Sequence, residues 1–534
     1  MDSDKVVKAM ARWWQRDKYE LELEGAAHHR GLFKPSSTSR SSSLTGRRHT
    51  VSQEDADQNA RNPMLYDPLS DGAVRTSTKM QYVAALVVCL GAVSAGTALA
   101  WTSPVLPQIS VDPTINITAN STNSDELRLT VGEQTWVSSL LAIGAFLAAL
   151  PTGYIADAIG RKYTALLMDV PFIVAWIMTI FAKSAGMLCL ARFLIGISTG
   201  SFCVVAPMYI SEIAETSIRG SLGTLFQLTL SCGILMVYLV GAAVSWKALS
   251  VFCLCIPIGL FIGMCFLPET PVYLLKKGRR GDAALSLKWL WGRYCDSRSA
   301  IQIIQTDLDS AGSDASFMDV FRNRAAKNAL IISMLLMFFQ QFSGVNAVIF
   351  YTVPIFKSAG STLNPSACSI IVGIVQVSMT LASSFLIERA GRKILLIFSS
   401  ICQLICLTVL GIYFDMKDSG KDVSEIGWLP LLSVVLFMVT FSLGYGPIPW
   451  LMMGELFPPD VKATAVALTV MSNWFSVFMV TKCFGSMVEA LGSDVTFWFF
   501  AFCMFSATLY VFFMVFETKG KSSAQIQMLL GAEK

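Results

Sequence analysis

Five amide side chains lie within long apolar stretches of this sequence, where a polar group is costly unless it has a partner or a ligand. They are Gln227, Gln340, Gln341, Asn346 and Gln376. An amide presents a hydrogen-bond donor and an acceptor side by side and carries no charge. A set of amides can therefore bind a neutral polar solute without the desolvation cost of a buried ion. The alternative role for each amide is hydrogen bonding from one helix to another.

The residue types that usually carry catalysis give no sign of it. The histidines, His28, His29 and His49, all lie in the polar amino-terminal stretch, so the apolar remainder has no imidazole for a nucleophile or a metal. Gly196-Ile-Ser-Thr-Gly200 matches a nucleophile elbow, but without a histidine its small residues favour close helix packing. The 13 cysteines include no C-x-x-C pair and are interpreted as small core residues. We therefore expect no catalytic residue, no metal, no cofactor and no enzymatic activity.

Charged residues recur in the same order at two places in the chain. Asp157-Ala-Ile-Gly-Arg-Lys162 is echoed by Glu388-Arg-Ala-Gly-Arg-Lys393, and Pro268-Glu-Thr270 by Phe516-Glu-Thr518. An acid also stands seven residues before a base in each half of the chain, as Glu212 and Arg219 and as Glu455 and Lys462. Such an internal repeat is typical of a carrier built from two similar halves.

We predict that these loop charges form ion pairs across the gap between the halves and close it on one side. The alternative is that they only anchor the ends of helices. The predicted gate residues are Asp157, Arg161, Glu212, Arg219, Glu388, Arg392, Glu455 and Lys462.

The elements that position all these residues are membrane helices. Of the 534 residues 54% are hydrophobic and 15% charged, against about 25% charged in ordinary globular proteins. Stretches of about 20 apolar residues, the length that spans a bilayer, begin near 81, 132, 163, 186, 221, 248, 327, 366, 393, 429, 462 and 494. The fold class is therefore an all-α membrane protein with twelve transmembrane helices in two parallel six-helix halves.

The predicted organisation has five parts. Residues 1–79 form a disordered cytoplasmic amino-terminal tail, because their serine-rich composition cannot bury enough apolar surface. Residues 80–267 and 327–516 are the two halves, 268–326 is a cytoplasmic linker, and 517–534 is a cytoplasmic tail. An even number of spans puts both termini on one side, and the many Lys and Arg residues of the linker favour the cytoplasm.

Two modifications are predicted outside the helices. Asn116 and Asn120 head N-glycosylation sequons in the first loop on the other side of the membrane, which fits an extracellular loop. Thr50 follows Arg47-Arg48-His49, which resembles a phosphorylation site or is an incidental basic run. A net charge of +4 is too small for a nucleic-acid surface, so the expected surroundings are the lipid bilayer and a small solute.

The motifs, taken in order, resemble those of the sugar porter family of the major facilitator superfamily over residues 80 to 525. A single motif is a weak signal, and eight in the correct order are very specific. They are Gly160-Arg-Lys162, Arg192-Phe-Leu-Ile-Gly196, Pro207-Met-Tyr-Ile-Ser-Glu212, Pro268-Glu-Thr-Pro271, Gln340-Gln-Phe-Ser-Gly-Val-Asn346, Gly391-Arg-Lys393, Gly446-Pro-Ile-Pro-Trp450 and Glu517-Thr-Lys-Gly520.

The resemblance implies the major facilitator fold and a monomeric carrier of a small neutral sugar in the plasma membrane. It also implies that amides from the fifth, seventh, eighth and eleventh spans bind the sugar hydroxyls and that a tryptophan of the tenth span forms one wall. The implied substrate-binding residues are Gln227, Gln340, Gln341, Asn346, Gln376, Trp450 and Asn473.

Helix geometry sets a condition on this site. Gln341 and Asn346 would lie roughly 140° apart on a straight helix, so they would not share a face. A break at Gly344, helped by Pro354, would turn both to the same side. The stretch Gly444–Pro449 gives the tenth span the same opportunity.

Two departures from the family bear on coupling. The first span, residues 81–106, has no carboxylate of the kind that proton-coupled members use, and Ser442 replaces a glutamate that many hexose carriers have. Downhill transport is therefore favoured. Asp169 and Lys482 remain as charges inside spans, and we expect both to reach the membrane surface by snorkelling.

The substrate prediction depends on the resemblance, with weak support from Ser442, whose small side chain leaves more room beside the site than a glutamate would. The first-span stretch 96–104, the Thr481-Lys482 pair and the long serine-rich tail are most similar to those of insect facilitated trehalose transporters, so trehalose is predicted. The alternatives are a facilitative glucose or hexose carrier, a proton-coupled sugar symporter that uses Asp169, and a sugar receptor that does not transport.

Overall fold

The computed structural model describes residues 77–110, 127–215, 218–292, 295–310, 319–359, 364–458, 461–521 and 523–531. The chain separates into two units, Met1–Ala73 and Val74–Lys534, and every described residue belongs to the second. Apart from turns and one isolated bridge, the described residues are helical. Thr50, Asn116 and Asn120 lie outside the described residues.

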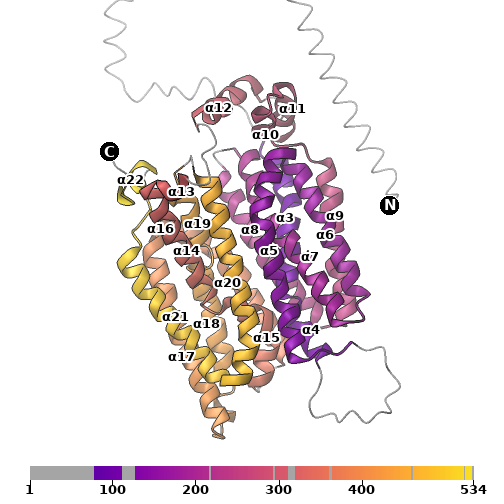
Figure 1. Cartoon of the computed structure of the whole chain (residues 1–534), viewed down its shortest axis with the longest axis vertical. Helices are drawn as coiled ribbons and strands as arrows, with labels where there is room; N and C mark the ends of the chain where they lie inside the picture. Colours follow the sequence, from indigo (N-terminus) through magenta and orange to yellow (C-terminus); the bar gives the residue numbers. More distant parts are fainter. Residues whose placement is uncertain are drawn as a thin grey trace, which may run out of the picture. The chain divides into compact units, whose positions relative to one another are not determined.

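Among the described residues, twelve helical segments are long and apolar enough to cross a membrane (Figure 1), which confirms the predicted number. The first six are α3 (Lys79–Ala100) with α4 (Thr102–Ile109), α5 (Val131–Ile159), α6 (Arg161–Ile180), α7 (Ala185–Ile213), α8 (Arg219–Gly241) and α9 (Trp246–Phe266). The second six are α14 (Arg324–Gln341) with α15 (Val345–Ala359), α16 (Pro365–Ala390), α17 (Arg392–Asp418), α18 (Leu429–Leu443) with α19 (Ile448–Leu456), α20 (Lys462–Leu491) and α21 (Ser493–Met514). Each predicted start lies within three residues of an observed one.

The helix ends define two faces of the bundle. We call one the linker side, because α10 (Pro271–Lys276), α11 (Arg280–Trp291), α12 (Ser297–Ser310) and α13 (Asp319–Arg322) connect the halves there (Figure 1). The last short helix, α22 (Ser523–Leu529), follows the twelfth span on the same side. The other face, where α4 ends and α5 begins, is the opposite side; the 3-10 turn η1 (Ser424–Ile426) precedes the tenth span there.

Small residues let the helices of each half approach closely. A β-carbon at Gly196 of α7 would lie 2.0 Å from the carbonyl oxygen of Leu141 on α5, and one at Gly200 would lie 2.5 Å from that of Ala145. The stretch Gly196–Gly200 is therefore a helix-packing surface, as its sequence indicated, and it follows no strand.

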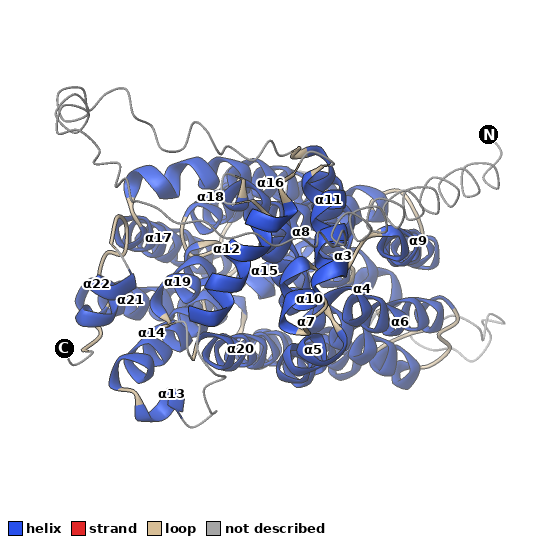
Figure 2. Cartoon of the chain, turned by 90° about the horizontal axis from the view of Figure 1, so that it is seen from above, coloured by secondary structure: helices blue, strands red, loops and turns tan. Residues whose placement is uncertain are grey.

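The main contacts between the two halves are made by three pairs of helices. α5 packs against α20, α8 against α16, and α4 against α15. Figure 2 shows α5 and α20 at one edge of the boundary between the halves and α8 and α16 at the other. The space between these pairs is where side chains from both halves can meet.

Candidate functional site

The seventh span is broken where the sequence predicted a break. α14 ends at Gln341 and α15 begins at Val345, and Gly344 between them has a φ of +85°, which strains any residue with a side chain. The Ser343 hydroxyl donates to the Gln340 carbonyl (2.7 Å) and accepts from the Val345 N–H (3.3 Å). Ser343 thereby satisfies two backbone groups that the break leaves without helical partners.

This break brings Gln341 and Asn346 together. The Asn346 side-chain N–H donates to the Gln341 side-chain oxygen, which a straight helix would not allow. Pro354 lies within α15, where Tyr351 departs from helical angles with φ −124° and ψ 22°. Gly344 therefore accounts for the break, and the region of Pro354 only for a kink.

The tenth span is broken between α18 and α19. Pro449 has no N–H, so the carbonyl of Tyr445, four residues earlier, cannot find a helical donor. The Gln340 side-chain nitrogen donates to the Tyr445 carbonyl (2.7 Å) and to the Gly446 carbonyl (2.8 Å). Gln340 therefore ties the break in the seventh span to the break in the tenth.

Gln340 is also the centre of an amide network. Its side-chain oxygen accepts from Gln341 (3.3 Å) and from Asn473 of α20 (3.1 Å), and Asn473 also contacts the sulfur of Met337 at 3.4 Å. Both donors and both lone pairs of Gln340 are thus used within the protein. The predicted residues Gln340, Gln341, Asn346 and Asn473 form one connected group, and in this state Gln340 positions the others.

Two residues of α17 that the sequence analysis missed support the same break. The Ser399 hydroxyl donates to the Thr440 carbonyl (2.8 Å) and accepts from the Tyr445 N–H (3.3 Å) and from the Gln403 side chain (2.6 Å). Gln403 is fully buried. It could have been found in the sequence in the same way as the other amides, because it is a polar amide inside an apolar span.

Gln227 and Gln376 flank the contact between α8 and α16. The hydroxyls of Ser231 and Thr380 lie 3.5 Å apart there, and each also donates to the carbonyl of the amide residue one turn earlier. Gln376 is 4% exposed, and its side-chain oxygen has no partner among the described residues. Gln227 is half-buried. A buried amide oxygen without a protein partner can accept a hydrogen bond from a polar ligand.

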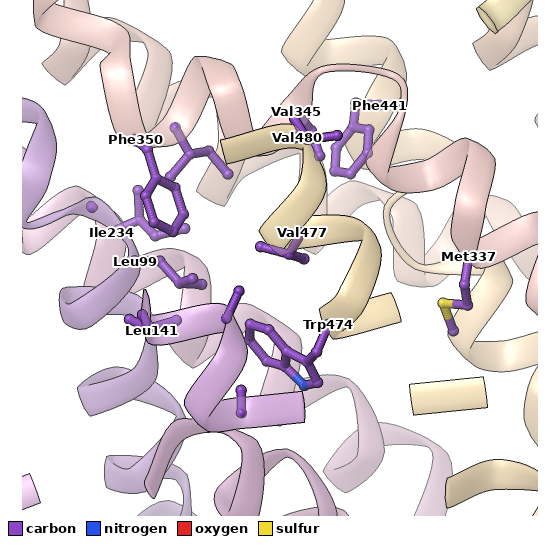
Figure 3. Close-up of a cluster of buried hydrophobic side chains, with 14 of the residues drawn as sticks. Leu99, Leu141, Ile234, Met337, Val345, Phe350, Phe441, Trp474, Val477 and Val480 are labelled. Atoms are coloured by element: carbon purple, nitrogen blue, oxygen red, sulfur yellow. The ribbon is translucent and has the colours of Figure 1, made fainter. Parts of the chain in front are cut away.

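Apolar side chains from both halves surround this region. Trp450 of α19 is half-buried against the core, and Figure 3 shows Leu99 and Leu141 of the first half opposite Phe350 and Trp474 of the second. The amides belong to the second half with the exception of Gln227, so the site joins a polar surface of one half to a mostly apolar surface of the other.

The first span is divided at Trp101 into α3 and α4, although Trp101 keeps helical angles (φ −53°, ψ −38°) and its N–H donates to the Thr97 carbonyl. α3 ends at Ala100 and α4 begins at Thr102. The fully buried Arg192 donates to the carbonyls of Ala98 (2.6 Å) and Val137 (3.1 Å) and lies 5.7 Å from the ring centroid of Trp101. A guanidinium inside the first half thus holds the end of α3 against α5.

On the linker side, Arg161 pairs with two carboxylates of its own half. Its guanidinium lies 2.9 Å from Glu212 and 3.0 Å from Asp157, and Glu212 also accepts from the Thr270 hydroxyl at 2.5 Å. Because the Arg161 side chain is only 5% exposed, the pair with Glu212 is shielded from water.

Glu269 and Glu517 occupy matching places in the two halves. Glu269 accepts from the N–H groups of Arg161 (3.0 Å) and Lys162 (3.1 Å) at the start of α6, and Glu517 from those of Arg392 (2.9 Å) and Lys393 (3.0 Å) at the start of α17. A carboxylate is stabilised at a helix amino terminus.

The two carboxylates differ in their proton affinity. Burial raises the pKa of Glu269, and the hydrogen bonds from Thr270, Lys162 and Arg161 oppose that rise only in part. Burial also acts on Glu517, but the N–H groups of Arg392, Lys519 and Lys393 outweigh it, so the pKa of Glu517 is lowered.

The second half repeats the ion pair of the first. Arg392 lies 3.0 Å from Glu455, and Lys462 donates to the Gly454 carbonyl at 2.6 Å while burial lowers the pKa of Lys462. The side chains of Arg219 and Glu388 lie outside the described part.

In this state Arg161 and Arg392 each pair with a carboxylate of their own half. The prediction that the loop charges pair across the gap when the linker side closes stays a prediction. The physical reason for the observed pairs is proximity. α6 and α7 are neighbours, so Arg161 and Glu212 meet where those helices reach the linker side. Each cluster therefore satisfies its own charges.

Asp169 does not snorkel. It lies in the middle of α6 at 0% exposure, and neither carboxyl oxygen has a partner among the described residues. The expectation that it reaches the membrane surface is wrong, because its side chain is fully buried in the first half, where α6 packs against α7 and α9. Lys482 is half-buried, and its ammonium group donates to Thr135 of the other half.

The sequence profile of one protein family, described as "Sugar (and other) transporter", matches residues 84–530. The chain belongs to the sugar transporter family. It is thus a membrane carrier and not an enzyme. The sugar porter motifs predicted this membership.

Relatives in insects match most of the chain. A facilitated trehalose transporter of Polypedilum vanderplanki is 38% identical over 449 residues, which cover 84% of this chain and 87% of that protein. One of Anopheles gambiae is 37% identical over 450 residues, which cover 84% of this chain and 55% of that protein. The chain thus spans about half the length of some of these relatives.

Solved structures show the same fold. The xylose transporter XylE of E. coli in a partially occluded inward open conformation gives a TM-score of 0.69 at 23% identity, covering 83% of this chain and 100% of that chain. A structure of the proton:xylose symporter XylE bound to 6-bromo-6-deoxy-D-glucose gives 0.68 at 22% identity, covering 85% and 99%. At this identity the likeness shows the major facilitator fold alone, and it confirms the predicted fold class.

The bonds between the two halves of this transporter lie toward the opposite side. Thr102 of α4 donates to the Phe350 carbonyl (3.1 Å), and the N–H of Val353 on α15 donates to Ser103 (3.1 Å). Tyr238 near the end of α8 donates to a carbonyl of α15 at 2.9 Å. The structure is therefore a state joined at the opposite side.

Proposed function

We propose that this transporter carries trehalose down its concentration gradient across the plasma membrane by alternating access. Support for the substrate comes from insect relatives named facilitated trehalose transporters at 37–38% identity. The observation that carries the proposal is the uncharged amide network of Gln340, Gln341, Asn346 and Asn473, formed at helix breaks in the membrane interior. Uncharged amides suit a neutral polyhydroxyl solute.

The seven substrate-binding residues that the sequence implied are proposed to have different roles. Gln341, Asn346, Gln376 and Asn473 bind hydroxyls, and Gln340 holds Gln341 and Asn473 in place. Trp450 covers an apolar face of the sugar, as aromatic rings do. Gln227 is the contribution of the first half. The proposed carrier is a monomer.

We also propose that the linker side faces the cytoplasm. The short loops carry similar numbers of Lys and Arg on both sides, whereas residues 268–327 carry ten, among them Lys276, Lys277, Arg279 and Arg280. A cysteine introduced at exposed Asp282 of α11 should react with an impermeant maleimide only after intact cells are opened. Labelling of intact cells would reverse the orientation.

The gate role of the loop charges remains a proposal. When the linker side closes, the clusters around Arg161 and Arg392 come closer and lose water, so each carboxylate needs its own arginine more. Arg161→Ala and Arg392→Ala should therefore shift the population toward the state open on the linker side. The measurement is cysteine modification from that side, and an unchanged rate in both variants would make these charges anchors only.

The test of the substrate is uptake of labelled trehalose and labelled glucose, each competed by the other, in cells without trehalase. Saturable trehalose uptake is expected. Saturable glucose uptake that excess trehalose does not inhibit would leave a hexose carrier instead. If a folded, sugar-binding preparation shows no counterflow, the receptor alternative replaces the carrier.

One observation favours a second candidate, proton-coupled transport. Asp169 is a fully buried carboxyl with no partner among the described residues, and a charge in that place is costly. If Asp169 couples proton and sugar movement, a pH gradient will drive sugar accumulation in proteoliposomes and Asp169→Asn will abolish that accumulation. Equilibration without accumulation, in parent and variant alike, supports the uniport.

A further inference from the structure

Lys482 is a charged residue inside the eleventh span that contacts the other half of the molecule. Its ammonium nitrogen lies 3.0 Å from the hydroxyl oxygen of Thr135 and 4.0 Å from the ring centroid of Trp136. Lys482 belongs to α20 and the other two residues belong to the first turns of α5. The contact therefore crosses the boundary between the halves near the opposite side.

The partners of the Lys482 ammonium group in this contact are a hydroxyl and an aromatic ring, and neither is a carboxylate. The Thr135 hydroxyl donates to the Gly132 carbonyl (2.8 Å), so its lone pairs are available to accept from Lys482. The face of a tryptophan ring attracts a cation, most strongly where water is limited. No carboxylate forms an ion pair with Lys482 among the described residues, and the nearby Glu133 is bound to the Thr130 N–H and hydroxyl in a capping box.

The surroundings of the contact are tightly packed. Gly485, one turn beyond Lys482, approaches Thr135 so closely that a β-carbon would lie 2.7 Å from the threonine methyl group. Further along the same two helices, the rings of Phe146 and Phe475 lie 6.1 Å apart. α5 and α20 must separate at the opposite side when the carrier opens there, so the Lys482 contact exists in one state of the cycle and not in the other.

We propose that Lys482, Thr135 and Trp136 form a latch that holds the opposite side closed, with Lys482 as a positioning residue for the transport cycle. A snorkelling lysine would need neither a ring nor a hydroxyl from the other half. A contact made in one state only biases the ratio of the two states. Trp136 is 44% exposed, and a cation–π contact at such a site corresponds to about a two- to fivefold change in that ratio. The proposal does not depend on which sugar is carried.

The test measures how fast a cysteine reacts when it is introduced at a buried position of the same boundary between the halves. Leu106 is 2% exposed and lies one turn after Thr102 and Ser103, which bond to α15. In a background without other cysteines, Leu106→Cys should react with an impermeant maleimide added at the opposite side only when that side opens.

Lys482→Met and Trp136→Leu should each raise the reaction rate severalfold, and the double variant should be no faster than the faster single one, because both changes remove one contact. Lys482→Arg keeps a cation over the ring and should stay near the parent rate.

A matched control lies on the same side. Lys247 stacks on Trp246 at 5.5 Å, but both belong to α9, so Lys247→Met removes a similar pair that does not cross the halves and should leave the rate unchanged.

A parental rate in Lys482→Met, or additive effects of the two single variants, would overturn the latch. If Lys482→Met does not fold, Thr135→Val carries the test, since it removes only the accepting hydroxyl. A parental rate in Thr135→Val then overturns the proposal.

Discussion

Replacing Gln340 or Gln376 by leucine makes a matched pair of perturbations, because the same amide is lost in two different bonding situations. The Gln340 side chain makes four hydrogen bonds inside the protein, to Tyr445, Gly446, Gln341 and Asn473. The Gln376 side-chain oxygen has no partner among the described residues.

The magnitude for Gln340 follows from its bonds. Four hydrogen bonds at about 0.5 to 1.5 kcal/mol each correspond to about 2 to 6 kcal/mol of stability. The Tyr445 carbonyl cannot recover a helical donor because Pro449 has no N–H, and Tyr445 is fully buried, so part of this loss is a true desolvation penalty. Gln340→Leu should therefore lower the thermal stability of the sugar-free carrier clearly.

Gln376→Leu should behave in the opposite way. It removes a buried polar group without breaking a bond within the described structure, so the stability of the sugar-free carrier should stay near that of the parent. Sugar binding should weaken by about 1 to 3 kcal/mol, roughly 5- to 150-fold, because the sugar loses a partner.

The assay is thermal unfolding of the purified carrier with and without saturating sugar. The stabilisation by sugar, which reports affinity, should shrink in Gln376→Leu while the sugar-free melting temperature holds. If Gln376→Leu melts as early as Gln340→Leu and still binds sugar like the parent, then Gln376 is a packing residue and the reasoning from its missing partner is refuted.

Three further predictions concern the site and its supports. Asn346→Ala should weaken sugar binding by about 1 to 3 kcal/mol in equilibrium titration, with surface expression near normal. Ser399→Ala should speed hydrogen exchange of the Tyr445 amide, because the Ser399 hydroxyl is the acceptor for that N–H; equal exchange rates would exclude the support role. Glu517→Gln should lower the melting temperature at pH 7. A lowered pKa stabilises the fold above the ordinary value of 4.5 and ceases to do so as the pH falls, so the difference should vanish in acid.

The helices could be predicted from the sequence because membrane spans need only length and apolarity. All twelve starts were found, and the break at Gly344 followed from the angle between Gln341 and Asn346. The amides were found because a polar group inside an apolar span is conspicuous.

What could not be predicted depended on which groups meet in space. Gln340 donates to the Tyr445 carbonyl, which has no helical donor because of Pro449. This hydrogen bond forms only because the seventh and tenth spans are neighbours in space. The same holds for Lys482 and Trp136 on different halves and for Arg161, whose partners lie in its own half. The order of charges in a sequence indicates that ion pairs form, but it does not show which residues are the partners.

The concentration of amides in one half has a consequence for energetics. If the hydroxyls of a bound sugar are held mainly by α14, α15, α16 and α20, those bonds persist while the apolar surface of the first half tilts past the sugar. A ligand held equally well in both states does not change their ratio. The sugar would then neither drive nor stall the reorientation, and the dissociation constants measured from the two membrane faces would be nearly equal.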